Sequence, residues 1–164
     1  MRIAILSDIH DNIWNLKKVL VDLKKKEAKV IIFCGDLGSP ASAKKLASAS
    51  IPTYIVFGNV DGAQYEITNW VKDNAPHVQL GKEMLEVKLG GRKTAVCHYP
   101  KLAKGLASTG DYDAVFYGHT HKAYQEKVGE CLLLNPGEIM AKSGRCTYAL
   151  YDTETDRVEI VEVS

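Results

Sequence analysis

Features that mark several large classes of protein are missing from this sequence of 164 residues. No apolar run reaches the roughly 18 residues that a membrane-spanning helix needs, so no membrane partner is predicted. The first residues lack the pattern of a secretory signal, which favours a cytoplasmic location. Neither sign of charge prevails, because 21 lysines and arginines against 20 aspartates and glutamates give a net charge of +1. That balance predicts no nucleic-acid partner.

Motifs for other kinds of phosphate chemistry are missing as well. The chain has neither G-x-x-x-x-G-K-[ST] nor G-x-G-x-x-G, which argues against the nucleotide-binding folds that use them. No arginine stands six positions after a cysteine, as a cysteine phosphatase requires. An aspartyl-phosphate enzyme would need D-x-D after its first strand, but here the second position is His10. The sequence therefore favours none of these classes.

Cysteine is sparse, with four residues and no C-x-x-C pair. Each cysteine lies in or beside an apolar run, as the buried, reduced thiols of cytoplasmic proteins do. One disulfide is the alternative that spacing alone leaves open. The four residues are Cys34, Cys97, Cys131 and Cys146.

The hydrophobic pattern alternates between strands and helices in the first half of the chain and is richer in strands in the second. In the first half, strands are expected at 2–7, 30–34 and 53–57, and helices at 12–27, 40–49 and 62–74. In the second half, strands are expected at 83–89, 92–97, 113–117, 122–128, 131–134, 147–151 and 157–162, and a short helix at 101–109. Gly90-Gly91 is a hairpin signal. The pattern predicts one α/β domain over residues 1–164, with parallel early strands and two packed sheets that have helices outside.

The apolar strands repeatedly end in small groups of possible metal ligands. Ligands of open α/β sheets bind at the carboxyl ends of the strands, so these groups are expected to converge on one crevice. Four of the five histidines fall in them, and only His77 lies elsewhere. Seven oxygen and nitrogen ligands would suit two divalent cations that share one carboxylate, with imidazole favouring Zn, Fe, Ni or Mn over Ca. The seven are Asp8, His10, Asp36, Asn59, His98, His119 and His121.

Five short motifs, in order along the chain, resemble those of the calcineurin-like metallophosphoesterases. They are Asp8-x-His10, Gly35-Asp36, Gly58-Asn59-x-Asp61, His98 and Gly118-His119-x-His121. The short chain and Asn135-Pro136-Gly137 are similar to the small YfcE-like phosphodiesterase branch. Each motif alone is weak, but five in order at strand ends make a specific signal.

The resemblance implies a four-layer αββα sandwich of two mixed β-sheets flanked by helices, with a binuclear metal centre. Asp8, His10 and His121 would hold one ion, and Asp36 would bridge to a second. That second ion would be held by Asn59, His98 and His119. With Asp36, Asn59 and His98 in catalytic roles, a hydroxide between the metals would attack a phosphoester in line. The cofactors would be two divalent ions, Mn first and otherwise Ni, Zn or Fe; the partners would be a small-molecule phosphoester and further copies, as a homodimer or homotetramer.

Residues beside the predicted ligands raise narrower questions. If residues 118–121 stay extended, His119 and His121 point to the same side and each could reach a different metal. Asp61 could orient a ligand histidine or cap the next helix, and Asn12 could contact substrate phosphate or cap a helix; the cap is the favoured interpretation of both. Many relatives carry histidine as a general acid where this chain has Val60, so easy leaving groups should be favoured. Tyr99-Pro100 also replaces Gly-His, which many relatives in the small branch carry.

Two other interpretations compete with the enzyme. The clusters could be ordinary turns and caps, since Asp, Asn and Gly are the expected turn residues. That interpretation does not explain why four histidines join them. The chain could also be a catalytically weak or inactive scaffold of the same fold, similar to the retromer subunit, in which metal ligands are substituted. All seven ligand positions are intact here, which argues against a scaffold.

Overall fold

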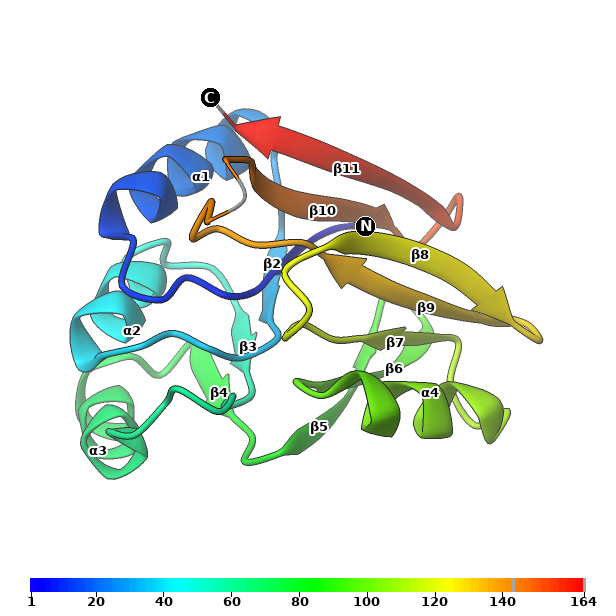
Figure 1. Ribbon diagram of the computed structural model, residues 1–164, viewed down its shortest axis with the longest axis horizontal. Helices are drawn as coiled ribbons and strands as arrows, with labels where there is room; N and C mark the ends of the chain where they lie inside the picture. The colour runs from blue at the N-terminus through cyan, green and yellow to red at the C-terminus, as the bar shows by residue number, and fades with distance from the viewer. Residues whose placement is uncertain (143, 164) are drawn as a thin grey trace.

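The first of two β-sheets is built mainly from the amino-terminal half of the chain (Figure 1). The computed structural model describes residues 1–142 and 144–163. This sheet has the strand order β11-β10-β1-β2-β3-β4. Strands β1 to β4 run parallel, as predicted for the early strands, and β10 and β11 pair antiparallel. The strands are β1 (Arg2–Leu6), β2 (Val30–Phe33), β3 (Thr53–Ile55), β4 (Val78–Leu80), β10 (Cys146–Asp152) and β11 (Arg157–Val163).

The second sheet comes from the middle of the chain and has the order β5-β6-β7-β9-β8. Strands β6, β7 and β9 are parallel, while β5 and β8 form antiparallel edges. Gly90 and Gly91 join β5 to β6 with φ of 54° and 85°, as the hairpin signal predicted. The strands are β5 (Met84–Leu89), β6 (Arg92–Cys97), β7 (Ala114–Phe116), β8 (Ala123–Val128) and β9 (Cys131–Pro136).

Within the described residues, four helices flank the two sheets. They are α1 (Ile13–Lys25), α2 (Pro40–Ala47), α3 (Gln64–Asn74) and α4 (Pro100–Ser108). Proline stands at the first helical position of α2 and α4, where no N–H is needed. The side chain of Asn12 accepts the backbone N–H of Asn15 at 3.1 Å, so the predicted cap at the start of α1 is confirmed. No described helix is long and apolar enough to span a membrane.

Three separate apolar cores fill the spaces between the layers. In the first, Leu16 and Val19 of α1 pack with Phe33 and other residues on the outer face of the first sheet. The second lies between the sheets and includes Ile5 and Phe116. In the third, the buried side chains are Ala95, Cys97, Ala103, Ala107, Val115, Tyr117, Cys131 and Leu133, from the second sheet and α4. Helices, sheet, sheet and helix therefore form four layers, and the predicted αββα sandwich is confirmed.

Two local features of the structure were not among the predictions from the sequence. Strand β4 was not predicted, because it has three residues and only Val78 among them is buried. On helix α1, the side chain of Trp14 is 76% exposed. Nζ of Lys17 lies over the Trp14 ring, 4.8 Å from its centroid, in a cation–π contact.

Candidate metal centre

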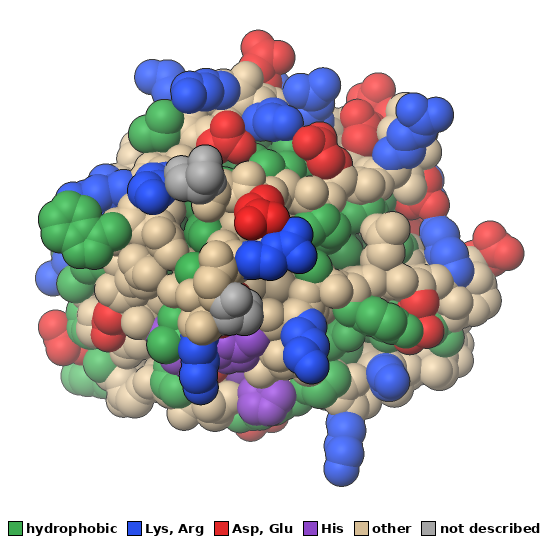
Figure 2. Space-filling view, turned by 45° about the horizontal axis from the view of Figure 1, so that its top comes forward, with side chains coloured by type: hydrophobic (Ala, Val, Ile, Leu, Met, Phe, Trp, Pro, Cys, Tyr) green, Lys and Arg blue, Asp and Glu red, His purple; other side chains and the backbone are tan. Residues whose placement is uncertain are grey.

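All seven predicted ligands come together in the loops that follow parallel strands of both sheets. Those after β1, β2 and β3 carry Asp8, His10, Asp36 and Asn59. Those after β6 and β7 carry His98, His119 and His121. The carboxyl ends of the two sheets therefore meet, as the pattern of strand ends predicted. Figure 2 shows histidine side chains gathered at one place on the surface.

The first group of ligand atoms lies around Asp8. Nε2 of His121 is 3.3 Å from Oδ1 of Asp8, and Nε2 of His10 is 3.7 Å from the same atom. One ligand atom from each of Asp8, His10, Asp36 and His121 lies within 4.8 Å of the others. Two carboxylates and two imidazoles at this spacing form a set that a divalent cation can use.

The second group lies around the side-chain oxygen of Asn59. Nε2 of His98 is 3.0 Å from this oxygen, and Nδ1 of His119 is 2.9 Å from it. The two imidazole nitrogens are themselves 3.2 Å apart. This second set is richer in nitrogen than the first.

Asp36 stands between the two groups. Its Oδ2 lies 3.4 Å from Nε2 of His10 and 3.4 Å from Nε2 of His98. Its Oδ1 accepts the backbone N–H of Val60 at 3.0 Å, which fixes the carboxylate plane. A Cβ on Gly58 would come within 2.1 Å of this Oδ1, so only glycine leaves room for Asp36. The carboxylate therefore lies within reach of both groups of predicted ligand atoms.

Two ligand histidines are oriented from behind by hydrogen bonds. Nδ1 of His98 donates to the carbonyl of Cys34 at 2.8 Å, which leaves Nε2 as the free lone pair. Nδ1 of His121 lies 2.6 Å from Oε2 of Glu138, whose side chain is 1% exposed. Sequence reasoning missed Glu138, although it follows strand β9 as the other clusters follow their strands. A carboxylate behind a ligand imidazole raises its basicity and fixes its tautomer.

Asp61 neither caps a helix nor orients a histidine. Helix α3 begins at Gln64 without a side-chain cap, so the favoured cap interpretation is wrong. Instead Asp61 is 3% exposed and accepts three backbone N–H groups. The distances from its carboxylate oxygens to the backbone nitrogens are 3.0 Å for Asp36, 2.9 Å for Gly38 and 2.7 Å for Gly58. It thereby ties the loop after β2 to the loop after β3.

The backbone around the ligands is strained. Residues 118–121 do not stay extended, because φ is 70° at His119 and 60° at His121. The condition under which both imidazoles would point to the same side is therefore not met. The backbone N–H of His119 donates to Oδ2 of Asp8, which holds this loop against the first one. Five of the seven ligand residues have positive φ, at a cost of order 1 kcal/mol each. They are Asp8, His10, Asp36, His119 and His121.

Bound cations fit this donor set. Oδ1 of Asp8 and Nε2 of His10 are buried, and among the described residues neither has a hydrogen-bond partner. A buried acceptor without a partner is costly, and a cation would satisfy both atoms. Burial alone would raise the pKa of Asp36, but the His98 imidazole and the N–H of Val60 hold it below its usual range. The carboxylate therefore stays ionised and ready to bind a cation.

A match to one family model assigns the chain to a superfamily. Residues 1–156 match the model of the calcineurin-like phosphoesterase superfamily domain. The chain belongs to this superfamily. A curated relative, Phosphodiesterase MJ0936 from Methanocaldococcus jannaschii, is 29% identical over 157 residues, which cover 94% of both chains.

Solved structures agree with this assignment. A novel archaeal phosphodiesterase matches with a TM-score of 0.93 and 28% identity over 99% of this chain and 100% of that one. YfcE, a phosphoesterase from E. coli, matches with a TM-score of 0.69 and 18% identity over the whole of both chains. Vacuolar Protein Sorting 29 from Cryptosporidium parvum matches with a TM-score of 0.68 and 18% identity over 98% of this chain and 95% of that one. At that identity the last two show the shared fold alone.

On the His98 side, the rim of the calcineurin-like centre carries Val60 and Tyr99. Val60 is 38% exposed and cannot donate a proton. The Tyr99 ring is 40% exposed and lies edge-on to the rings of His98 and His119, at 5.1 and 5.2 Å. This side of the centre therefore offers apolar and aromatic surface.

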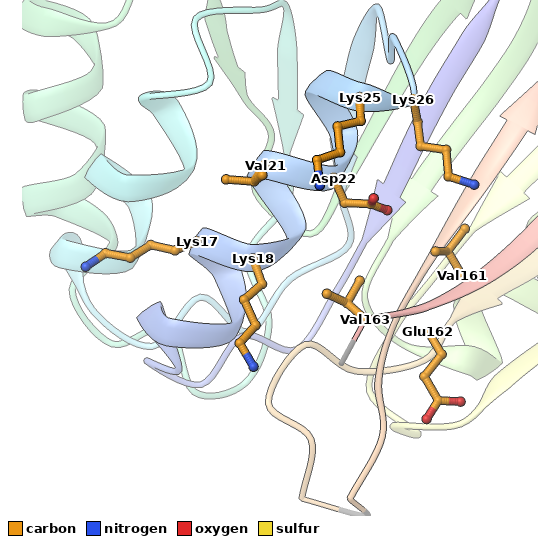
Figure 3. A pocket seen from close by; sticks show the side chains of 9 residues that line it. All are labelled: Lys17, Lys18, Val21, Asp22, Lys25, Lys26, Val161, Glu162 and Val163. Atoms are coloured by element: carbon orange, nitrogen blue, oxygen red, sulfur yellow. The ribbon is translucent and has the colours of Figure 1, made fainter.

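A hollow lies apart from the predicted ligands, between α1 and the edge strand β11 (Figure 3). Its volume is about 670 Å³, and four lysines of α1 and its end contribute to its lining. Asp22 of this hollow accepts the hydroxyl of Tyr148 at 2.6 Å, a contact that joins α1 to β10. None of the seven ligand residues lines it, so it is not part of the metal centre.

Proposed function

We propose that this protein hydrolyses phosphodiesters with two divalent cations as cofactors. One observation carries the proposal: Oδ2 of Asp36 is equidistant, at 3.4 Å, from imidazole nitrogens of the two ligand groups. A carboxylate between two groups of ligand atoms is placed to bridge two neighbouring cations. The family and the relatives named phosphodiesterase support the reaction class.

Some residues of the centre would bind the cations, and others orient the residues that bind them. Asp8, His10 and His121 would hold one cation, and Asn59, His98 and His119 the other. When bound, the cation pair would lower the pKa of water and neutralise phosphoryl oxygens. Four imidazoles beside carboxylate and amide oxygens suit Mn²⁺ first, with Ni²⁺, Zn²⁺ and Fe²⁺ as further fits. Glu138 and Cys34 orient His121 and His98, and Asp61 fixes the loops.

Hydrolysis forms a bond from the water oxygen to phosphorus and breaks the ester P–O bond. The departing alkoxide must acquire a proton, and Val60 cannot supply one. The chain's own residues therefore favour esters of acidic alcohols, whose alkoxides leave without protonation. Tyr99 offers a ring face to an aryl or nucleobase group on the same side.

The proposal is tested with metal-free protein reconstituted with Mn²⁺ or Ni²⁺ and assayed on bis(p-nitrophenyl) phosphate. We expect hydrolysis that depends on added metal and is abolished in Asp36→Ala. A matched control is Asp111→Ala, which removes an exposed carboxylate away from the centre. Protein that binds two cations but hydrolyses no phosphoester would contradict the proposal and favour the scaffold.

A further inference from the structure

We propose that the hollow beside His121 binds a second phosphate group of the substrate, which makes phosphodiesters that carry a further phosphate the preferred substrates. The inference rests on the proposed phosphodiesterase function. The hollow has a volume of about 490 Å³. It is lined by Thr120, His121, Lys122, Glu138 and Lys142. A volume of that size accommodates a phosphate with part of a sugar.

The imidazole of His121 separates the hollow from the metal centre and lines both. Its Nε2 lies 3.3 Å from Oδ1 of Asp8, on the side of the ligands. Its Nδ1 is bonded to Glu138, which lines the hollow. A substrate whose reacting phosphoryl group is bound at the centre can therefore extend past this imidazole into the hollow.

The charge of the hollow is complementary to an anion. Lys122 and Lys142 are exposed, and within residues 1–142 and 144–163 neither ammonium group forms an ion pair. The carboxylate of Glu138 is 1% exposed and lies against His121, so its charge is held by the imidazole. Figure 2 shows lysine or arginine side chains on either side of the exposed histidines. Two unpaired ammonium groups beside the centre favour a phosphate group there.

Both lysines extend from backbone that is tied to the ligand loops. The N–H of Lys122 donates to Oγ1 of Thr120, which also accepts from Asn135. Shortly before Lys142, the N–H of Met140 donates to the carbonyl of Asp8 at 2.9 Å. Asn12 in turn donates to the carbonyl of Met140 at 3.0 Å. The backbone at Lys122 and the backbone two residues before Lys142 are thus held against the loops of the metal centre.

The two sides of the centre differ, and the difference would orient a diester. On the side of His98 and His119, Val60 and Tyr99 present apolar and aromatic surface. A diester with one uncharged and one phosphorylated substituent would place the uncharged one against Tyr99. The phosphorylated substituent would then lie in the hollow between Lys122 and Lys142.

The test uses a matched pair of substrates, thymidine 5′-(p-nitrophenyl phosphate) with and without a 3′-phosphate. We expect the metal-loaded wild-type protein to show kcat/KM about five-fold higher for the 3′-phosphorylated ester, as two partly exposed ion pairs would give. The ratio should fall towards one in Lys122→Gln/Lys142→Gln and return in Lys122→Arg/Lys142→Arg. Lys101→Gln, an exposed lysine at the start of α4 on the Tyr99 side, is the matched control and should keep the ratio.

A binding measurement separates this inference from the proposed function. Calorimetry compares thymidine 3′,5′-bisphosphate with thymidine 5′-phosphate on the metal-loaded protein, where no turnover is needed. Tighter binding of the bisphosphate that is lost in the double glutamine variant would support the inference even if no ester were hydrolysed. Equal affinities, or a preference that survives in that variant, would overturn it. Absence of activity on bis(p-nitrophenyl) phosphate would count against the proposed function alone.

Discussion

Oε2 of Glu138 lies 2.6 Å from Nδ1 of His121, and this carboxylate is almost completely buried. The contact aims the other imidazole nitrogen, Nε2, at Asp8. Glu138 lies in the loop after β9, whose carboxyl end is beside that of β7 in the parallel part of the second sheet. The centre thus depends on a residue outside the seven predicted ligands.

Glu138→Gln should weaken divalent-metal binding by about 10- to 100-fold, because the neutral amide accepts the imidazole N–H less strongly. Competition of the variant with a fluorescent chelator for Mn²⁺ measures this loss. Glu130→Gln, in the exposed turn before β9, is the control and should bind Mn²⁺ as the wild type does. Unchanged Mn²⁺ affinity in Glu138→Gln would show that the contact does not orient His121.

Asp61→Ala should lower the free energy of unfolding of the metal-free protein by about 3 kcal/mol, because three N–H groups lose a charged acceptor. The distances of 2.7 to 3.0 Å and the 3% exposure of Asp61 support a value of this size. Urea unfolding measures it, with Asp111→Ala as an exposed control that should change stability by less than about 0.5 kcal/mol. If Asp61→Ala lowered the free energy of unfolding by no more than the Asp111→Ala control, the loops would be held by other contacts.

The rate of hydrolysis should fall steeply as the pKa of the leaving alcohol rises, because Val60 supplies no acid. A series of aryl phosphodiesters measures the slope. Val60→His should flatten the slope and raise the rate for the poorest leaving group by at least about ten-fold, since general acids contribute about 10²- to 10⁴-fold. A flat dependence in the wild type would reveal another proton donor. Val60→Ala, which adds no acid, should keep the steep slope.

The four cysteines should react slowly with thiol reagents in the native protein. All are buried free thiols, and burial raises the pKa of Cys97 to about 12 and that of Cys146 to about 11. At pH 8 both pKa values lie above the pH, so almost no reactive thiolate is present. Ellman's reagent should label four thiols only after unfolding. Two thiols that stay unlabelled in denaturant without reductant would indicate a disulfide.

Much of the fold was predictable because continuous apolar runs that stop abruptly indicate several of the strands. The run before Asp8 and the run before Gly35 become β1 and β2, buried on both faces. The ligand clusters followed from the same signal, since a polar group directly after a buried parallel strand must lie at its carboxyl end. Strand β4 gave no such signal, because it has three residues and one buried side chain.

The contacts behind the ligands could not be predicted in the same way. Asp61 stands shortly before a helix and therefore resembles a cap, yet two of its three partners lie 23 and 25 residues away along the chain. Glu138 carries no periodic signal, because its role depends on β7 and β9 being neighbours. The left-handed backbone at His119 and His121 has the same origin, since it is imposed by contacts between loops such as that with Asp8.

Electron paramagnetic resonance of the protein loaded with Mn²⁺ tests the central claim most directly. If Asp36 bridges two cations, two equivalents of Mn²⁺ should bind and give an exchange-coupled spectrum. Asp36→Ala should lose the coupled signal along with tight binding at both positions. A spectrum of isolated, uncoupled Mn²⁺ in the wild-type protein, or full retention of one tight equivalent in Asp36→Ala, would contradict a shared two-metal centre.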